Sequence, residues 1–167
     1  AYPFAAERYD EMFVAPGCPR PHWAPLLEEL TRAGADGVRS REAQAQRQIQ
    51  DSGVTYNVYG DPRGPERPWK LDGLPLIIAP EEWAEVEAGL IQRARLFNQI
   101  LADLYGPQTL LQQGLIPPEL ILGQSGFLRP MHGTVMPDGV HLHLYAADLA
   151  RAADGRWWVM ADRTQNP

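Results

Sequence analysis

The sequence has little of three features that would each point to a class of protein: cysteine, excess basic charge and long apolar runs. Cys18 is the only cysteine, which excludes an internal disulfide and predicts a reducing, cytoplasmic compartment. The formal net charge of -6 argues against a general nucleic-acid surface, because such surfaces are basic. No run of about eighteen apolar residues occurs, so no membrane span is expected.

Sequence motifs of familiar catalytic sites are missing as well. The Gly-rich stretch 123–133 contains Arg129, but it follows neither the Walker A nor the Rossmann pattern. His141 and His143 would share one face of a strand. No third metal ligand stands at a known spacing, so a half-exposed strand face is the favoured interpretation. No serine or cysteine triad signature is present, and no reaction follows from any single motif.

The first part of the chain, residues 1–53, is expected to be mainly helical. Its apolar spacing and its Pro and Gly residues predict three helices, around 7–13, from 24 to about 34, and over 41–51. Ser40 would cap the third of these helices, and Gly53 would end it.

The second part, residues 54–167, is expected to mix helices and strands. Strands are predicted over 54–59 and within 69–78, and short helices over 109–114 and from about 117. The longest helix is predicted from Pro80, which suits a first helical position, to Gly106-Pro107, which would end it. Its apolar stripe recurs every three or four residues: Trp83, Val86, Leu90, Ala94, Phe97, Leu101 and Leu104.

A hairpin is predicted over 140–163, because Asp154-Gly155 stands between two runs of strand-forming residues. With these two residues as the loop, Asp148 lies opposite Ala161. The face that carries Asp148 is otherwise apolar apart from Arg163. Either these two side chains form an ion pair, or the open end of the hairpin is wet and both are solvated. A one-residue slip in register would exchange the two faces.

Several stretches together resemble the circularly permuted ATP-grasp proteins of the glutathionylspermidine-synthase-like group. Each stretch alone is unspecific, and the resemblance lies in their order along the chain. They are Tyr9-Asp10-Glu11-Met12, Val54-Thr55-Tyr56, Glu66-Arg67-Pro68-Trp69-Lys70-Leu71-Asp72, Glu82-Trp83, Gly89-Leu90-Ile91-Gln92-Arg93, Leu101-Ala102-Asp103-Leu104-Tyr105-Gly106, Gly114-Leu115-Ile116-Pro117-Pro118-Glu119-Leu120 and the terminal hairpin with Asp148.

The resemblance implies the N-terminal part of a permuted ATP-grasp fold. This fold is α+β, with several helices and a mostly antiparallel sheet that ends in the hairpin. Family members are considerably longer, and the chain starts without Met and stops directly after a strand. We therefore expect residues 1–167 to be a single N-terminal region of a longer protein.

The implied function of the longer protein is that of an ATP-dependent carboxylate–amine ligase, which forms peptide bonds through an acyl phosphate. Its cofactors would be ATP and Mg²⁺, and its substrates a carboxylate and an amine or peptide. Residues 1–167, without the rest of the longer protein, are expected to bind neither ATP nor Mg²⁺ and to be inactive. The alternative is a catalytically degraded ATP-grasp protein that serves as a binding or scaffold partner.

The resemblance also identifies candidate site residues. In the family, Mg²⁺ ligands come from an Asp on one strand and a Glu-x-Asn on the next, and an Arg two residues before the Asp holds phosphate. Here Asp148 is kept, but Ala146, Ala161 and Arg163 replace the other three. Asp148 is thus the metal candidate, with Asp162 as a second acid on the other face. The phosphate-binding candidates are Arg129, Arg151 and Arg163.

Overall fold

A computed structural model describes residues 4, 6–56, 67–69 and 71–164 of the chain. The chain divides into two units, Ala1–Ala79 and Pro80–Pro167, and each is described by itself. Both mix helices with short antiparallel strands, so the architecture is α+β, as predicted. In the described ranges the strands form three separate two-stranded sheets rather than one larger sheet.

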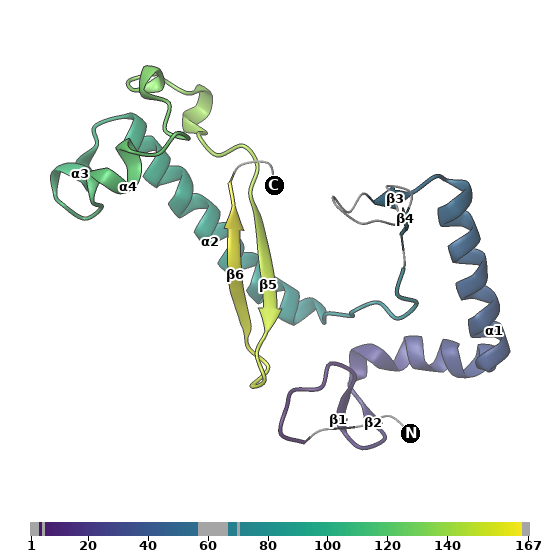
Figure 1. Ribbon diagram of the computed structural model, residues 1–167. Helices are drawn as coiled ribbons and strands as arrows, with labels where there is room; N and C mark the ends of the chain where they lie inside the picture. Colours follow the sequence, from purple (N-terminus) through teal and green to yellow (C-terminus); the bar gives the residue numbers. More distant parts are fainter. Residues whose placement is uncertain (1–3, 5, 57–66, 70, 165–167) are drawn as a thin grey trace. The chain divides into compact units, whose positions relative to one another are not determined.

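The first unit contains one long helix between two small hairpins (Figure 1). Its elements are β1 (Phe13–Ala15), β2 (Cys18–Pro19), η1 (Pro21–Trp23), α1 (Ala24–Asp51), β3 (Thr55–Tyr56) and β4 (Arg67–Pro68). The second unit places a hairpin beside a long helix and follows that helix with short helical turns. Its elements are α2 (Pro80–Tyr105), α3 (Thr109–Gln112), α4 (Pro118–Leu122), η2 (Arg129–Met131), η3 (Pro137–Gly139), β5 (Ala146–Arg151) and β6 (Trp157–Arg163).

The prediction of a helix around residues 7–13 is wrong, because the Asp10 side chain accepts backbone hydrogen bonds there. The carboxylate of Asp10 accepts hydrogen bonds from the backbone N–H groups of Met12, at 2.9 Å, and Phe13, at 2.8 Å. Such local bonds from Asp compete with helical ones and favour turns. The chain therefore turns at this point and enters β1.

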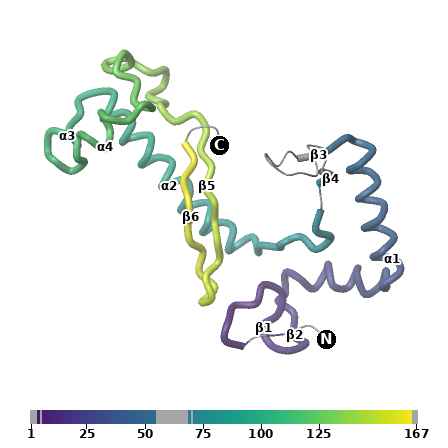
Figure 2. Tube along the Cα trace, in the orientation of Figure 1, coloured from purple at the N-terminus to yellow at the C-terminus, as the bar shows by residue number. Residues whose placement is uncertain are grey.

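The helix α1 is bent at Gly34, where sequence reasoning expects a helix to end. Gly34 has φ 66° and ψ 174°, a conformation that is essentially restricted to glycine. Figure 2 shows the resulting bend in the trace of α1. Helical geometry resumes directly after Gly34, so the predicted start at Arg41 with a cap at Ser40 is wrong.

The strand pair β3–β4 joins Thr55 to Pro68 and Tyr56 to Arg67. It confirms part of the strand predicted over 54–59, whose last three residues lie outside the described ranges. The strand predicted within 69–78 is absent from its described residues, 69 and 71–78. There the carboxylate of Asp72 accepts a hydrogen bond from the backbone N–H of Leu74 at 3.0 Å, which favours a turn.

The helix α2 has the bounds that the sequence predicts, and most of its apolar stripe faces the rest of the second unit. Leu104 is its one buried residue among those described, at 5% exposure. Trp83 departs from the predicted stripe, since it is 47% exposed.

The start of α3 is held by Asp103, which lies in the last turn of α2. Its carboxylate accepts hydrogen bonds from the backbone N–H groups of Thr109 and Leu110, both at 2.9 Å. None of the described helices is both long and apolar enough to cross a membrane.

The burial of Leu104 predicts an uneven response of α2 to truncation of its leucines. Leu104→Ala should lower the free energy of unfolding by about 2–5 kcal/mol, because it removes a buried side chain. Leu96→Ala makes the same change at a 53% exposed position of the helix and should cost no more than about 0.5 kcal/mol. Urea denaturation of both variants checks this prediction. Equal effects would show that α2 does not pack through Leu104.

Candidate functional site

The register of the terminal hairpin decides which candidate residues meet. Asp148 pairs with Ala161, as the sequence predicts, and Ala146 pairs with Arg163. Nearer the turn the register shifts by one residue, so that Leu149 pairs with Val159. The extra residue on β6 between these pairs is Met160, which marks a β-bulge.

The predicted two-residue loop is wrong, and the error explains the shift. Ala152 and Arg156 bracket a three-residue loop, in which the N–H of Gly155 donates to the carbonyl oxygen of Ala152 at 2.9 Å. Gly155 has φ 87°, as the last residue of a three-residue hairpin loop commonly does. The extra loop residue moves the register by one position, and the bulge at Met160 moves it back. The pairing of Asp148 with Ala161 therefore agrees with the simpler prediction.

The two faces of the hairpin differ in burial. The pairs that face α2 are half-buried on both strands: Ala147 with Asp162, Leu149 with Val159 and Arg151 with Trp157. The opposite face carries Asp148, Ala161 and Arg163, all exposed. The face that carries Asp148 is therefore largely apolar, as predicted, but it is open to solvent rather than buried.

Of the two alternatives for Asp148 and Arg163, the ion pair is the one present on this exposed face. Arg163 donates from Nη2 at 2.7 Å and from Nε at 3.1 Å to the same carboxylate oxygen, Oδ2 of Asp148. The two side chains are 56% and 49% exposed. The guanidinium of Arg163 thus holds Asp148, the acid proposed from the sequence as a metal ligand.

The residues around Asp148 do not fit a Mg²⁺ site. This ion prefers several oxygen ligands, but Ala161 offers no side-chain oxygen and Arg163 brings a positive charge. Asp162, the second acid considered, points to the other face of the hairpin. Among the described residues, no group of three or more His, Cys, Asp and Glu side chains gathers as a metal site would require.

Asp162 instead joins the hairpin to α2. Its carboxylate accepts hydrogen bonds from Arg93 Nε at 3.1 Å and Nη2 at 2.5 Å, and from the Tyr145 hydroxyl at 2.6 Å. The hydrogen bond from Arg93, followed by that from Tyr145, lowers the pKa of Asp162 below its ordinary value. Burial, followed by the bond to Asp162, raises the pKa of Tyr145. Sequence reasoning missed this cluster, although Arg93 stands beside the apolar stripe of α2.

The three phosphate-binding candidates lie on different elements. Arg129, in η2, donates from Nη2 to the carbonyl oxygen of Leu122 at 3.1 Å. Arg151, at the turn end of β5, has a side chain only 6% exposed, is paired with Glu82 of α2, and lies 4.2 Å from the centre of the Trp157 ring. Arg163 lies at the other end of the hairpin and on its other face. The described structure therefore does not bring the three together as one anion site.

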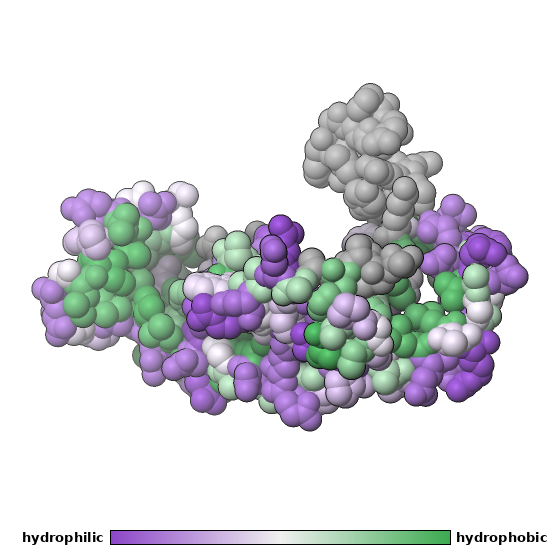
Figure 3. Space-filling view, turned by 90° about the horizontal axis from the view of Figure 1, so that it is seen from below, coloured by the Kyte–Doolittle hydropathy of each residue, from purple (hydrophilic) through white to green (hydrophobic). Residues whose placement is uncertain are grey.

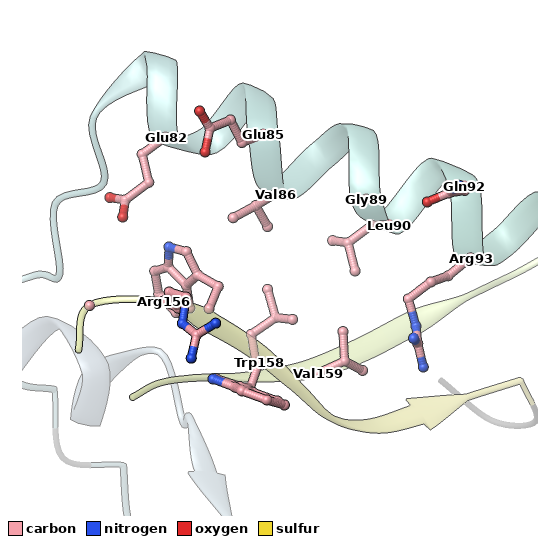
Figure 4. Close-up of a pocket in the computed structure, with 13 residues that line it drawn as sticks. Glu82, Glu85, Val86, Gly89, Leu90, Gln92, Arg93, Arg156, Trp158 and Val159 are labelled. Carbon is pink, nitrogen blue, oxygen red and sulfur yellow. The ribbon is translucent and has the colours of Figure 1, made fainter. Parts of the chain in front are cut away.

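Between α2 and the hairpin runs an open groove of about 550 Å³. Figure 4 shows Val86 and Leu90 of α2 facing Val159 across it, with Glu82 and Arg156 at one end and Arg93 at the other. A Cβ added at Gly89, on the helix side, would meet no atom within 4 Å. The groove carries charges of both signs, so it does not favour one charged ligand.

Comparison with known proteins adds to this geometry. Residues 75–167, more than half of the chain, match the family described as circularly permuted ATP-grasp type 2. The chain belongs to this family. The matched range includes α2, the groove and the whole hairpin, with the ion pairs Asp148–Arg163 and Asp162–Arg93 among its contacts.

Relatives of this ATP-grasp chain come from several bacteria. The uncharacterized protein sll0335 of Synechocystis sp. is 40% identical over 159 residues, which cover 95% of this chain and 33% of the relative. The uncharacterized protein Rv2567 of Mycobacterium tuberculosis is 38% identical over 167 residues, or 95% of this chain and 19% of the relative. A second protein of that species, Rv2411c, is 34% identical over 97% of this chain and 29% of its own length. The chain thus spans a third or less of these relatives.

The lowered pKa of Asp162 predicts a contribution to acid stability. An acid whose pKa is lower in the folded state stabilises the fold above its unfolded value, about 3.9. This contribution is lost as the pH falls from about 4 through the lower folded pKa. Asp162→Asn should therefore destabilise the ATP-grasp chain at pH 7 and reduce the loss of stability as the pH falls below about 4. Urea denaturation across this range, with the exposed Glu87→Gln as control, measures it, and an unchanged acid profile would contradict the assignment.

The exposure of Asp148 and Arg163 predicts a weak coupling in the isolated chain. A double-mutant cycle with Asp148→Asn and Arg163→Gln should give a small coupling free energy, because solvent screens a half-exposed pair. The coupling should shrink further in about 1 M salt, where the screening length is about 3 Å. A large coupling that salt does not change would show that the pair is buried in solution.

Proposed function

We propose that this chain is the N-terminal part of a longer, glutathionylspermidine-synthase-like ATP-grasp protein that ligates a carboxylate to an amine or peptide. The observation that carries the proposal is the family match over α2 and the hairpin. ATP and Mg²⁺ are the cofactors that the family implies. Within the longer protein, the chain would supply a structural frame rather than the metal-binding centre.

The contacts of three aspartates support a structural role for the chain. Asp148 is held by Arg163, Asp162 by Arg93 and Tyr145, and Asp103 by the backbone of α3. Each of these acids already has partners that neutralise or hydrogen-bond it. Groups occupied in this way stabilise local structure, whereas a Mg²⁺ site needs several oxygen atoms free to converge on the ion. The oxygen ligands would then come from other parts of the longer protein.

A second function is favoured by the same ion pair. If the longer protein has no metal-binding centre elsewhere, it would be a catalytically degraded ATP-grasp protein that serves as a binding or scaffold partner. Arg163 supports this alternative, since it stands where the family pattern has an oxygen ligand and its charge would repel a cation.

Thermal unfolding of the longer protein separates the two functions. A ligase should be stabilised by ATP only when Mg²⁺ is present, by about 2.7 kcal/mol at a ligand concentration one hundred times Kd. It should also release phosphate when a carboxylate and an amine are supplied together. A scaffold protein should show neither response. Stabilisation that is the same with and without Mg²⁺ would contradict a metal-dependent ligase.

If the metal ligands come from other parts of the longer protein, residues 1–167 alone should not bind ATP tightly. Titration calorimetry should detect no tight ATP binding to this chain, with or without Mg²⁺, because the described residues form no metal-ligand group and their phosphate candidates lie apart. Micromolar ATP binding to this chain would show that it contains the nucleotide site. The longer protein, titrated under the same conditions, serves as the positive control.

A further inference from the structure

The hairpin has an outer face, turned away from α2, that is largely apolar and open to solvent. Its large side chains are Trp158, at 53% exposure, and Met160 of the bulge, at 67%. Leu144, two residues before β5 and in phase with this face, is 68% exposed. Apolar groups clustered on a surface mark an interaction site more often than single exposed ones do. We define the outer face as Leu144, Ala146, Asp148, Ala150, Trp158, Met160, Ala161 and Arg163.

The shape of the outer face suits another layer of protein. Ala146, Ala150 and Ala161 lie between the larger side chains and would let a second layer approach closely. A two-stranded hairpin is marginally stable when little of it is covered, and here α2 covers only one face. Covering the outer face would give the hairpin the buried second side that sheets in protein interiors have.

The charge of the outer face is also compatible with burial. Asp148 and Arg163 are its two charged residues, and they neutralise each other through two hydrogen bonds. Burying either charge alone would be costly, whereas a hydrogen-bonded pair costs far less to bury. The cover therefore needs no net charge, but it needs polar groups for Oδ1 of Asp148 and for the other N–H groups of Arg163, because both bonds end on Oδ2.

Other parts of the second unit leave apolar side chains exposed in the same way. Figure 3 shows hydrophobic residues at the surface of the end that holds α3 and α4, where Leu115 is 66% and Leu120 61% exposed. Only Trp23 and Leu104 are buried among the hydrophobic residues of the described ranges. This exposure indicates that the chain lacks the polypeptide that would complete its packing.

The length of the relatives identifies the missing cover. Each of the three matches nearly all of this chain with a third or less of its own length. We propose that further polypeptide of the same longer protein packs on the outer face and buries the Asp148–Arg163 pair within the molecule. This inference rests on the proposal that the chain is part of a longer protein, but not on ATP binding or ligase activity.

Thiol labelling of the longer protein tests this cover. In a Cys18→Ser background, Ala161→Cys places a thiol on the outer face, and Ala153→Cys places one at the exposed hairpin turn as a matched control. The rate of alkylation of each peptide, followed by mass spectrometry, is compared with its rate in urea. We expect labelling at position 161 to be at least about tenfold slower than in urea, because a packed layer must open first. At position 153 we expect labelling near the urea rate.

Labelling at position 161 near its urea rate would overturn the proposal. Protection that disappears on dilution, together with a change of oligomeric state, would also overturn it, because a second copy would then be the cover. Hydroxyl-radical footprinting of the unmodified protein at Trp158 and Met160 keeps the test valid if a cysteine variant does not fold. Neither readout needs nucleotide, so failure of the cover and failure of ATP binding are distinguished.

Discussion

The β-bulge at Met160 is the constraint on which the arrangement of the second unit depends. It puts two consecutive residues, Met160 and Ala161, on the exposed side of β6 and thereby returns Asp162 to the side of α2. Without it, strict alternation from Val159 would turn Asp162 outward and Arg163 inward. Arg93 would then lose its carboxylate, and Asp148 would lose its guanidinium. One extra residue thus sets both ion pairs at the open end of the hairpin.

Polar contacts at both ends, rather than a continuous apolar core, hold the hairpin to α2. Arg151 pairs with Glu82 at the turn end, and Asp162 pairs with Arg93 at the open end. Between these two contacts the apolar side chains do not close the groove. Gly89 lines it without a side chain, and a Cβ there would meet no atom within 4 Å. Directional contacts of this kind fix the position of an element, but they stabilise it less than close packing does. Further contacts within the longer protein that we propose would add to this attachment.

The sequence predicted the features set by a long apolar pattern, but it missed turns set by single local hydrogen bonds, as at Asp10 and Asp72, and features that depend on tertiary contacts. The bounds of α2 follow from Pro80, the apolar stripe and Gly106-Pro107, all of which act within the helix. The pairing of Asp148 with Ala161 was predicted from a two-residue loop that is wrong, because the loop and the bulge offset each other. Which face of the hairpin packs on α2 was not predictable, since alternation alone does not say which side another element will cover.

The bond to Arg163 accounts for Asp148 without a metal ion. Mg²⁺ requires several oxygen ligands around it, and Asp148 alone would leave most of its positions to water. Arg163 matches the single charge of Asp148 and donates two hydrogen bonds to its carboxylate. With Ala161 and Arg163 beside it, Asp148 is held by an arginine and lacks the further oxygen ligands that Mg²⁺ would need. The ion pair also leaves the outer face without net charge, which lowers the cost of burying it.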